Sequence, residues 1–420
     1  MRSRVRIPRV AVATAALLAV GVLPAMALTS DNYSAPTNIG GTKSGVYTDL
    51  QTYTYNGAGY TVAVIDGAFY PNAPQFKDPD GSSAVILERC VGQSSGSFLS
   101  LCSAPSTADR SVYPWETRTG TFLYQGGTNA SKPSNAPNNT CSDPANTEDG
   151  FCQAVHGNWV SGIAIGRPAV RNDGTLGTIT YAGVAPGARL ATFKIGGGSS
   201  QAASGWPAAS VLDALSMIEA LARGASSGGL KDFPITAVNI SSNGASTSTE
   251  QACAAGSDGA RIDAQAARLK QYGIAVVMAS GNDAKTGATG SWTCGSNIVV
   301  VGASDVSAPT APTSYSNLSS NVDLLAPVGA GWPCTGGNCI FTTYKDLGWS
   351  SSVWGTSFAA PQVAGAFAVL RQKYPLASVD RLVGLMKTSG NALTGTRASQ
   401  APNAKALNLD AALDTPLPWQ

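Results

Sequence analysis

The chain has 420 residues, of which 43% are hydrophobic and 12% are charged, and its 27 basic and 25 acidic side chains give a formal net charge of +2. A chain of this length and apolar content can bury a large core, which excludes an intrinsically disordered protein. The near-balance of charge offers no basic surface of the kind that attracts nucleic acid, so we expect no nucleic-acid partner.

The first 27 residues have the pattern of a secretory signal peptide. The segment MRSRVRIPR carries four arginines, the apolar run VAVATAALLAVGVL follows, and Ala25-Met26-Ala27 offers small residues for cleavage. The apolar run is shorter than the roughly 20 residues needed to span a bilayer, which argues against a membrane anchor. We predict cleavage after Ala27 and a secreted mature protein, extracellular or periplasmic, that is not attached to a membrane.

Residues 28–57 are polar and without periodicity, and they predict a short N-terminal extension that is too small for a globular propeptide. Beyond them, five short apolar runs predict buried strands: TVAVID (61–66), ARLATFKI (188–195), ITAVNIS (235–241), IAVVMAS (274–280) and NIVVVGA (297–303). These runs are apolar on both faces, as in strands that are covered by helices on both sides.

Helical patterns lie between the predicted strands. Residues 206–224 place apolar side chains at helical spacing, with Pro207 near the start and Gly224 at the end, and residues 258–273 repeat this plan. The alternation predicts an α/β fold: a three-layer sandwich with a mainly parallel, doubly wound sheet flanked by helices. Residues 77–154 break the pattern, since they read as loop and hold four cysteines, and we predict a long disulfide-pinned insertion there.

Eight cysteines are disulfide candidates: Cys90, Cys102, Cys141, Cys152, Cys253, Cys294, Cys334 and Cys339. An even number in an exported chain favours disulfides. A zinc site is the alternative, but the chain has no short CxxC spacing and only one histidine. The connectivity stays open; pairing of neighbours along the chain would join Cys90–Cys102, Cys141–Cys152, Cys253–Cys294 and Cys334–Cys339.

Three segments place reactive side chains at the ends of predicted elements. Asp66 ends the strand 61–66, His156 opens the helical stretch HGNWVSGIAIG, and Ser357 lies between Gly355-Thr356 and an apolar helix. Taken singly, each has an ordinary structural explanation as a cap, a turn former or a packed histidine. Taken together, they supply the nucleophile, base and carboxylate of a serine hydrolase, in the chain order Asp, His, Ser.

The chain resembles the subtilisin-like serine proteases of the subtilase family over nearly all of residues 58–415. TVAVIDGA resembles the aspartate strand of that family, VHGNWVSG its histidine helix and GTSFAAPQVAG its serine motif. Further resemblances follow the family's order: GVAPGARL (183–190), VNISSN (238–243), ASGND (279–283), YSNLSSNVDLLAPVG (315–329) and LNLDAAL (407–413). The resemblance implies that residues 58–420 form one subtilase catalytic domain.

This resemblance implies a serine endopeptidase that hydrolyses polypeptides through an acyl-enzyme. It implies that Ser357 is the nucleophile, His156 the general base and Asp66 the residue that orients the imidazole. Asn282 and the backbone N–H of Ser357 would stabilise the oxyanion. Substrate would lie between two segments, Ser241, Ser242, Asn243 and Gly244 on one side and Ala279, Ser280 and Gly281 on the other. Because these stretches carry no charge, we expect a broad or apolar preference at the first pocket.

The chain also departs from the family pattern. Trp159 and Gln362 stand where relatives commonly have further histidines, and Phe358 stands where methionine is common; we interpret these residues as core packing. We expect no required cofactor and a monomeric protein. A structural calcium ion is an open alternative, for which the candidate ligands are Asp78, Asp80, Asp143, Glu148 and Asp149, with solvated loop acids as the competing explanation.

Two other functions compete with that of a protease. A catalytically silent subtilase scaffold that serves as a binding module is the main alternative, but a decayed enzyme usually loses a catalytic residue, and Asp66, His156, Ser357 and Asn282 are all present. A serine esterase of the α/β-hydrolase type predicts a GxSxG motif and the order Ser, Asp, His, and the chain has neither.

Overall fold

The computed structural model describes residues 55–67, 69, 73–91, 156–173, 177–195, 206–224, 232–245, 253–331, 340–343 and 349–417. The predicted signal peptide, nearly all of the predicted N-terminal extension and residues 92–154 of the predicted insertion lie outside the described residues.

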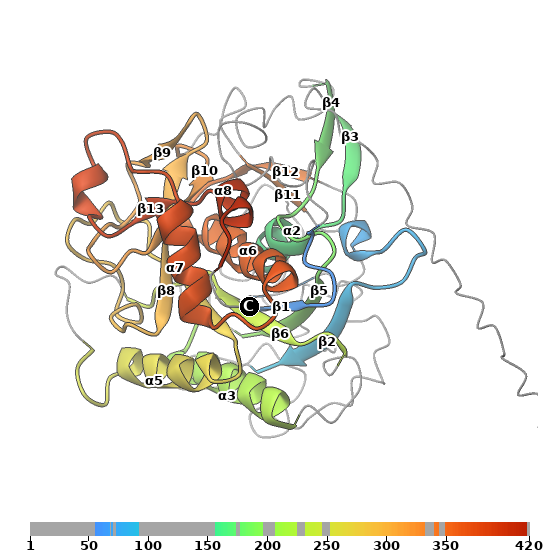
Figure 1. The fold of residues 1–420 in the computed structure, drawn as a ribbon, viewed down its shortest axis with the longest axis horizontal. Coiled ribbons are helices and arrows are strands. Elements are labelled where there is room, and N and C mark those ends of the chain that lie inside the picture. Colours follow the sequence, from blue (N-terminus) through green and yellow to red (C-terminus); the bar gives the residue numbers. More distant parts are fainter. Residues whose placement is uncertain are drawn as a thin grey trace, which may run out of the picture.

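A sheet of nine strands lies at the centre of the described part of the chain (Figure 1). The strand order is β13-β10-β8-β7-β6-β1-β5-β2, and β9 pairs with β8. Every pair is parallel except β8 with β9. The strands are β1 (Thr61–Asp66), β2 (Val85–Cys90), β5 (Arg189–Lys194), β6 (Ile235–Ile240), β7 (Ala275–Ala279), β8 (Ile298–Asp305), β9 (Ala308–Pro312), β10 (Leu324–Val328) and β13 (Lys405–Ala406). The five predicted strands are therefore confirmed as β1, β5, β6, β7 and β8.

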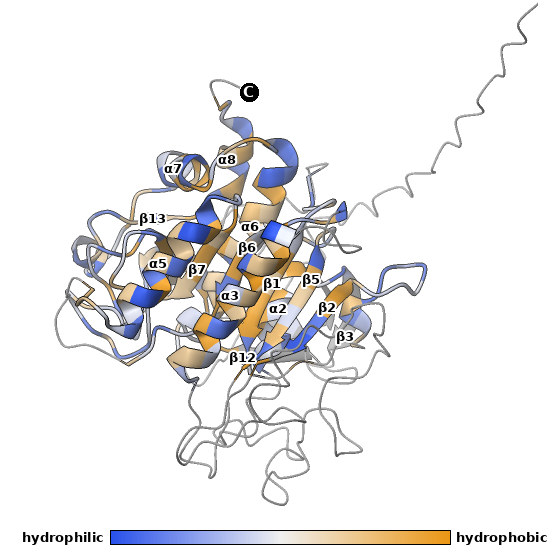
Figure 2. Cartoon of the chain, turned by 90° about the horizontal axis from the view of Figure 1, so that it is seen from below, coloured by the Kyte–Doolittle hydropathy of each residue, from blue (hydrophilic) through white to orange (hydrophobic). Residues whose placement is uncertain are grey.

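Helices cover both faces of this sheet (Figure 1). On one face lie α2 (His156–Ile165), α6 (Ala360–Lys373), α7 (Val379–Ser389) and α8 (Leu409–Asp414), and on the other lie α3 (Ala208–Gly224) and α5 (Asp258–Lys270). Figure 2 shows the apolar strands behind α3 and α5, whose polar residues face outward. The predicted three-layer, mainly parallel fold is confirmed.

Smaller elements complete the described structure. Two antiparallel hairpins are formed by β3 (Ala169–Asp173) with β4 (Gly177–Tyr181) and by β11 (Ile340–Thr343) with β12 (Trp349–Val353). Short 3-10 helices are η4 (Pro74–Phe76), η9 (Thr356–Phe358) and η10 (Ala398–Gln400).

The central strands are apolar on both faces because each face packs against a different core. In β1, Val62 and Val64 belong to the core beneath α2 and α6, whereas Ala63 and Ile65 belong to the core beneath α3. Alternation of side chains along a strand sends successive residues to opposite faces, so a strand between two helical layers needs apolar residues throughout. Asp66 ends the same strand, fully buried on the α2 side.

The strand order reverses at β1 and β6. From β1 the chain runs to the edge strand β2 and returns to β5 beside β1, and it then crosses to β6 and continues outward through β7, β8 and β10 on the other side. In open α/β sheets, ligands bind outside the carboxyl ends of the strands at such a reversal. Asp66 ends β1 at this point, and Ser241 follows β6.

Helices α2 and α6 approach each other closely. A Cβ atom added to Gly365 of α6 would lie 2.8 Å from the carbonyl oxygen of Ala164 in α2 and 2.9 Å from Cβ of Val184. Glycine is therefore required for this contact, which sets the distance between the helix that begins with His156 and the helix that follows Ser357.

The prediction that residues 77–154 form a loop-like insertion is wrong at its start. Residues Val85–Cys90 form β2, an edge strand of the main sheet that pairs with β5 in parallel. Its apolar run is interrupted by Glu88 and Arg89, which are both buried, and this interruption masks the strand in the sequence. Only residues beyond Val91 remain available for the predicted insertion, and they lie outside the described residues.

Candidate active site

Asp66 and His156 form a close pair at the reversal point of the sheet. Nδ1 of His156 lies 2.9 Å from Oδ1 and 3.0 Å from Oδ2 of Asp66. The carboxylate is fully buried, whereas 18% of the imidazole side chain is exposed. An ionised carboxylate only accepts hydrogen bonds, so the tautomer consistent with this contact carries its proton on Nδ1 and leaves Nε2 as an acceptor. The pairing holds the ring by one edge and leaves the other available for chemistry.

Ser357 lies in η9, directly before α6. Its Oγ donates to the backbone carbonyl of Ser241 at 3.1 Å, and Oγ of Ser241 donates to the carbonyl of Ser357 at 2.7 Å. No hydrogen bond among the described residues joins Ser357 to His156. The ring of Phe358, the next residue, has its centroid 5.4 Å from that of His156, which brings the two segments together. Hydrogen bonds of catalytic groups are often long in ligand-free structures and shorten when substrate binds.

The side-chain amide of Asn282 lies beside this serine. Its Oδ1 accepts from the backbone N–H of Thr356 at 2.8 Å and from the Thr356 hydroxyl at 2.9 Å. Nδ2 is therefore the end of the amide that stays available, and a Cβ added to Gly355 would lie 3.1 Å from it. Asn282 is exposed, and within the described structure neither its Nδ2 nor the backbone N–H of Ser357 takes part in a hydrogen bond. The amide of Asn282 is thereby held next to the segment that carries Ser357.

The segments that follow β6 and β7 flank these donors. Residues 241–244 follow β6, and residues 280–281 follow β7. They are joined to each other directly, because Nδ2 of Asn243 donates to the carbonyl of Ser280 at 3.2 Å. The second segment is joined to the serine loop, since the N–H of Gly281 donates to Oγ1 of Thr356 at 3.0 Å. The two predicted substrate-binding segments therefore lie side by side at the site.

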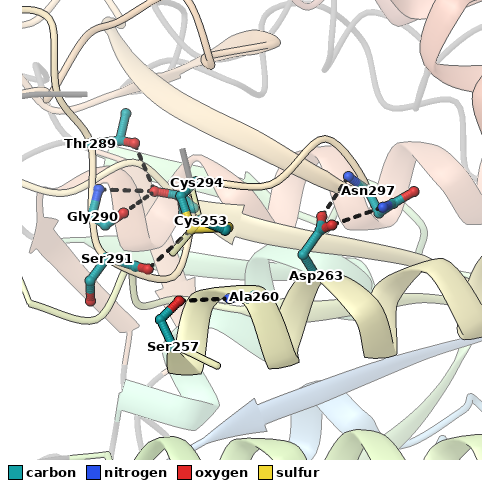
Figure 3. Close-up of a disulfide and its surroundings, with 10 residues drawn as sticks. Cys253, Ser257, Ala260, Asp263, Thr289, Gly290, Ser291, Cys294 and Asn297 are labelled. Carbon is teal, nitrogen blue, oxygen red and sulfur yellow. Dashed lines mark hydrogen bonds between the residues drawn. A yellow bond between two sulfur atoms is a disulfide. The ribbon is translucent and has the colours of Figure 1, made fainter. Parts of the chain in front are cut away.

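A disulfide anchors the loop between β7 and β8, which carries Cys294, to the segment that precedes α5 (Figure 3). Cys253, which precedes α5, is bonded to Cys294, with an S–S distance of 2.08 Å. Asp263 of α5 binds the same loop, because its carboxylate accepts from the backbone N–H of Asn297 at 2.7 Å and from the Asn297 side chain at 2.9 Å. The other six cysteines have side chains outside the described part of the chain, so their pairing stays a prediction.

Aromatic rings surround His156. The ring centroids of Trp206 and Trp159 lie 5.7 and 6.4 Å from the imidazole, in edge-on arrangements, and Trp159 also lies 6.0 Å from Phe358. Gln362 is fully buried and donates through Nε2 to the carbonyls of Pro327 and Phe358, at 2.7 and 3.0 Å. Trp159 and Phe358 thus form one wall of the site as well as packing in the core.

The described part of the predicted calcium ligand set does not fit a cation. Oδ1 of Asp78 accepts from Arg167 at 2.8 Å, and Oδ2 accepts from Arg189, so two guanidinium groups already occupy this carboxylate. Oδ1 of Asp80 accepts from the backbone N–H of Ser82 at 2.9 Å. The described residues hold no group of three or more metal-ligating side chains, and Asp143, Glu148 and Asp149 lie outside them.

Two residues of the site were not singled out from the sequence. Thr356 holds both Asn282 and Gly281 through its hydroxyl, and the GTS sequence around it was the available signal. Tyr315 donates its hydroxyl to the carbonyl of Gly329 at 2.8 Å and accepts from the N–H of Gly355 at 3.1 Å. Burial raises the pKa of the Tyr315 phenol above its usual range, so the phenol stays protonated at this contact.

The family follows from a match over most of the chain. The statistical model of the subtilase family matches residues 57–406, a range that includes every residue of the site. The chain belongs to the subtilase family. This family consists of serine-type peptidases, and the predicted resemblance is confirmed.

Individual relatives of this subtilase match over shorter stretches. Subtilisin DY of Bacillus licheniformis is 32% identical over 115 residues, which cover 26% of this chain and 37% of that protein. An extracellular protease of Xanthomonas campestris pv. campestris is 32% identical over 148 residues, which cover 34% of this chain and 23% of that protein. The matched stretch thus spans well under half the length of either relative.

Solved structures share the fold of this subtilase at low sequence identity. A protease from Pseudoalteromonas arctica superposes with a TM-score of 0.58 at 20% identity, covering 91% of this chain and 96% of that one. A cold-adapted subtilisin-like serine proteinase gives a TM-score of 0.51 at 18% identity, covering 87% and 95% of the two chains. These likenesses establish the architecture.

Proposed function

We propose that the chain is a secreted serine endopeptidase that hydrolyses peptide bonds of polypeptides through Asp66, His156 and Ser357. The single observation that carries this proposal is the contact of 2.9 Å between Nδ1 of His156 and the buried Asp66, next to Ser357. Membership of the subtilase family supports the same reaction class. The chemistry needs only side chains and backbone groups of the site, so no step requires a metal ion.

In the proposed reaction, Oγ of Ser357 attacks the scissile carbonyl while Nε2 of His156 takes its proton. The carbonyl π bond breaks, and its electron pair becomes the oxyanion of a tetrahedral intermediate. Asp66 stabilises the imidazolium through Nδ1. Collapse of the intermediate breaks the C–N bond, and His156 returns the proton to the leaving amine. Water then repeats the sequence on the acyl-enzyme and regenerates the Ser357 hydroxyl.

We assign the oxyanion to Nδ2 of Asn282 and the backbone N–H of Ser357. Support comes from the two bonds that Thr356 donates to Oδ1 of Asn282, which hold this amide next to Ser357 and leave Nδ2 as its donor end. Such preorganised donors act without reorganisation cost, and in subtilisin the loss of one such donor lowers kcat by about 10²–10³-fold.

An active-site-directed fluorophosphonate tests this function. The purified protein is expected to be labelled and to hydrolyse casein, and Ser357→Ala is expected to abolish both. Ser399→Ala changes an exposed serine of η10 and is the matched control, which should keep labelling and hydrolysis. Full hydrolysis by Ser357→Ala would overturn the assignment.

The same experiment distinguishes the alternative of a catalytically silent scaffold. The bond from Ser357 to the carbonyl of Ser241, rather than to His156, is the observation that favours this alternative. A silent scaffold would resist the fluorophosphonate and leave casein intact while remaining folded.

For the location, we propose export through residues 1–27. The Arg-rich start, the apolar run and the small residues before position 28 support this assignment, and the Xanthomonas relative is named an extracellular protease. None of the helices in the described part of the chain combines the length and apolar character needed to cross a bilayer. N-terminal sequencing of protein from the medium should begin at Leu28; a start well beyond residue 60 would indicate a larger propeptide.

A further inference from the structure

The side chain of Asn243 occupies the space between the two segments that flank the reacting serine. A Cβ added to Gly281 would lie 2.3 Å from Nδ2 of Asn243, and one added to Gly290 would lie 2.5 Å from its Cβ. Both distances are too short for real atoms, so Asn243 leaves no room beside these glycines; Nδ2 of Asn317 would also lie 2.4 Å from the Cβ added to Gly281. Nδ2 is also tied across the space to the carbonyl of Ser280 at 3.2 Å.

The proposed reaction requires a side chain of the substrate to enter this same space. The attacked carbonyl must lie within bonding reach of Ser357 Oγ with its oxygen toward Asn282. Oγ of Ser357 is 3.1 Å from the carbonyl of Ser241, at the start of one segment, and Asn282 directly follows Gly281 in the other. The residue that supplies the carbonyl (P1) is therefore flanked by both segments, and its side chain points into the crevice between the ends of β6 and β7.

Asn243 is held in this position from behind. Its carbonyl accepts from the N–H of Trp292 at 3.1 Å, and the carbonyl of Ala245 accepts from the N–H of Ser291 at 2.9 Å. These residues belong to the loop that the Cys253–Cys294 disulfide anchors. The backbone of Asn243 is thus part of a bonded strip, and displacing its side chain would sacrifice the bond to Ser280 and packing against two glycines.

We propose that Asn243 closes the P1 site of this enzyme, so that it cleaves after small residues such as glycine, alanine and serine. This inference rests on the proposed protease function and names its substrate class. It narrows the expectation of a broad or apolar preference, because an apolar lining accepts large side chains only where space is left for them. Asn243 acts here as a specificity-determining residue.

The test uses peptide p-nitroanilides that differ only at P1, with alanine, serine, leucine or phenylalanine there. Since each surplus methylene in a site of fixed size changes the transition-state energy measurably, the wild-type enzyme is expected to have kcat/KM at least about 100-fold higher for alanine than for phenylalanine. Asn243→Gly is expected to raise the ratio of kcat/KM for the phenylalanine substrate to kcat/KM for the alanine substrate at least about 10-fold.

Two further variants serve as a second test and as a control. Asn243→Ala also removes the amide, and alanine gives the backbone less freedom than glycine does. If Asn243→Gly fails to fold, Asn243→Ala should still widen the P1 preference in the same direction. Asn403→Ala alters an exposed asparagine, bonded to the carbonyl of Ser320, and should leave the P1 profile unchanged. Circular dichroism checks folding of each variant.

The outcomes separate this inference from the proposed function. A wild-type enzyme that is labelled by fluorophosphonate at Ser357 but cleaves best after phenylalanine or leucine would overturn the role of Asn243 and keep the protease. An unchanged ratio of kcat/KM between the phenylalanine and alanine substrates in both Asn243 variants would also overturn the role of Asn243 and keep the protease. A folded protein that is neither labelled nor active on any member of the series would overturn both.

Discussion

At the scale of single residues, Thr356 decides which end of the Asn282 amide faces the reacting serine. Its backbone N–H and its hydroxyl both donate to Oδ1, and the hydroxyl oxygen accepts from the N–H of Gly281. Because Oδ1 of Asn282 accepts both bonds from Thr356, Nδ2 is the end of the amide that faces away from Thr356. The loop can approach this closely because Gly355 adopts a φ of 114°, which favours glycine.

Thr356→Val therefore tests whether the amide needs this support. The variant keeps the shape of the side chain but removes the hydroxyl, so Asn282 becomes free to rotate. We expect kcat on a small-P1 peptide to fall about tenfold, which is less than the about 10²–10³-fold cost of losing an oxyanion donor outright. KM should change little, because the amide acts mainly in the transition state. Steady-state kinetics measure both values.

The conservative variant Thr356→Ser is the control for this prediction. It restores the hydroxyl and should recover most of kcat. An unchanged kcat in Thr356→Val, or an equal loss in Thr356→Ser, would show that the hydroxyl does not position Asn282.

At the scale of elements, the site depends on how one loop is attached to α5. The loop carries Gly290 and Trp292, which back the segment containing Asn243, and it is fastened by the Cys253–Cys294 disulfide (Figure 3). Close approach adds to this, since a Cβ on Gly259 of α5 would lie 2.2 Å from the carbonyl of Ser291. The N-terminus of α5 is capped, because Oγ of Ser257 accepts a hydrogen bond from the N–H of Ala260.

Removal of this disulfide should lower the free energy of unfolding without removing any group that takes part in the reaction. The bond closes a sequence separation of 41 residues, and the loop-entropy relation gives a loss of about 4 kcal/mol in the free energy of unfolding for the double change Cys253→Ser and Cys294→Ser. Urea unfolding measures this difference. Reducing agent should lower the free energy of unfolding of the wild-type protein by breaking this bond. The double variant lacks the bond and should not show this part of the loss.

At the scale of the whole molecule, one partly buried ion-pair cluster joins distant parts of the chain. Asp78 precedes β2, Arg167 follows α2 and Arg189 opens β5, and both arginines bind the same carboxylate. Burial acts to raise the pKa of Asp78, but the two guanidinium groups outweigh it and hold the pKa below its ordinary value. The charged form is therefore favoured by folding.

This shift predicts a stability that depends on acid. A carboxyl whose pKa is lower in the folded state contributes stability that is complete above its unfolded pKa of about 3.9 and is lost as the pH falls through the folded value. Asp78→Asn should lower the free energy of unfolding at pH 7, because two cations lose their partner, and the difference from wild type should shrink below pH about 4. Urea unfolding at several pH values measures this difference.

An exposed ion pair provides the comparison. Asp258 pairs with Arg261 on the surface of α5, with 52% of the aspartate side chain exposed, so Asp258→Asn should cost less than about 1 kcal/mol. A difference between Asp78→Asn and wild type that stays constant down to pH 2 would contradict the role assigned to Asp78.

Much of the fold follows from local pattern. Strands such as β1, β6 and β7 are buried along their whole length and mostly apolar because both faces are covered, and α3 ends at the predicted Gly224. Prediction failed at β2, where Glu88 and Arg89 are buried in the sheet region and break the apolar run. Local propensity cannot reveal such a strand, since its pairing with β5 depends on the tertiary structure.

The sequence by itself determined the family, the mainly parallel sheet and the candidates Asp66, His156, Ser357 and Asn282, because motifs and strand periodicity are properties of short segments. Only the tertiary structure decided what meets at the site. The ring of Trp206 beside His156 and the amide of Asn243 between Gly281 and Gly290 depend on chain segments far apart in sequence. Such contacts are set by packing of whole elements, and no spacing within one segment encodes them.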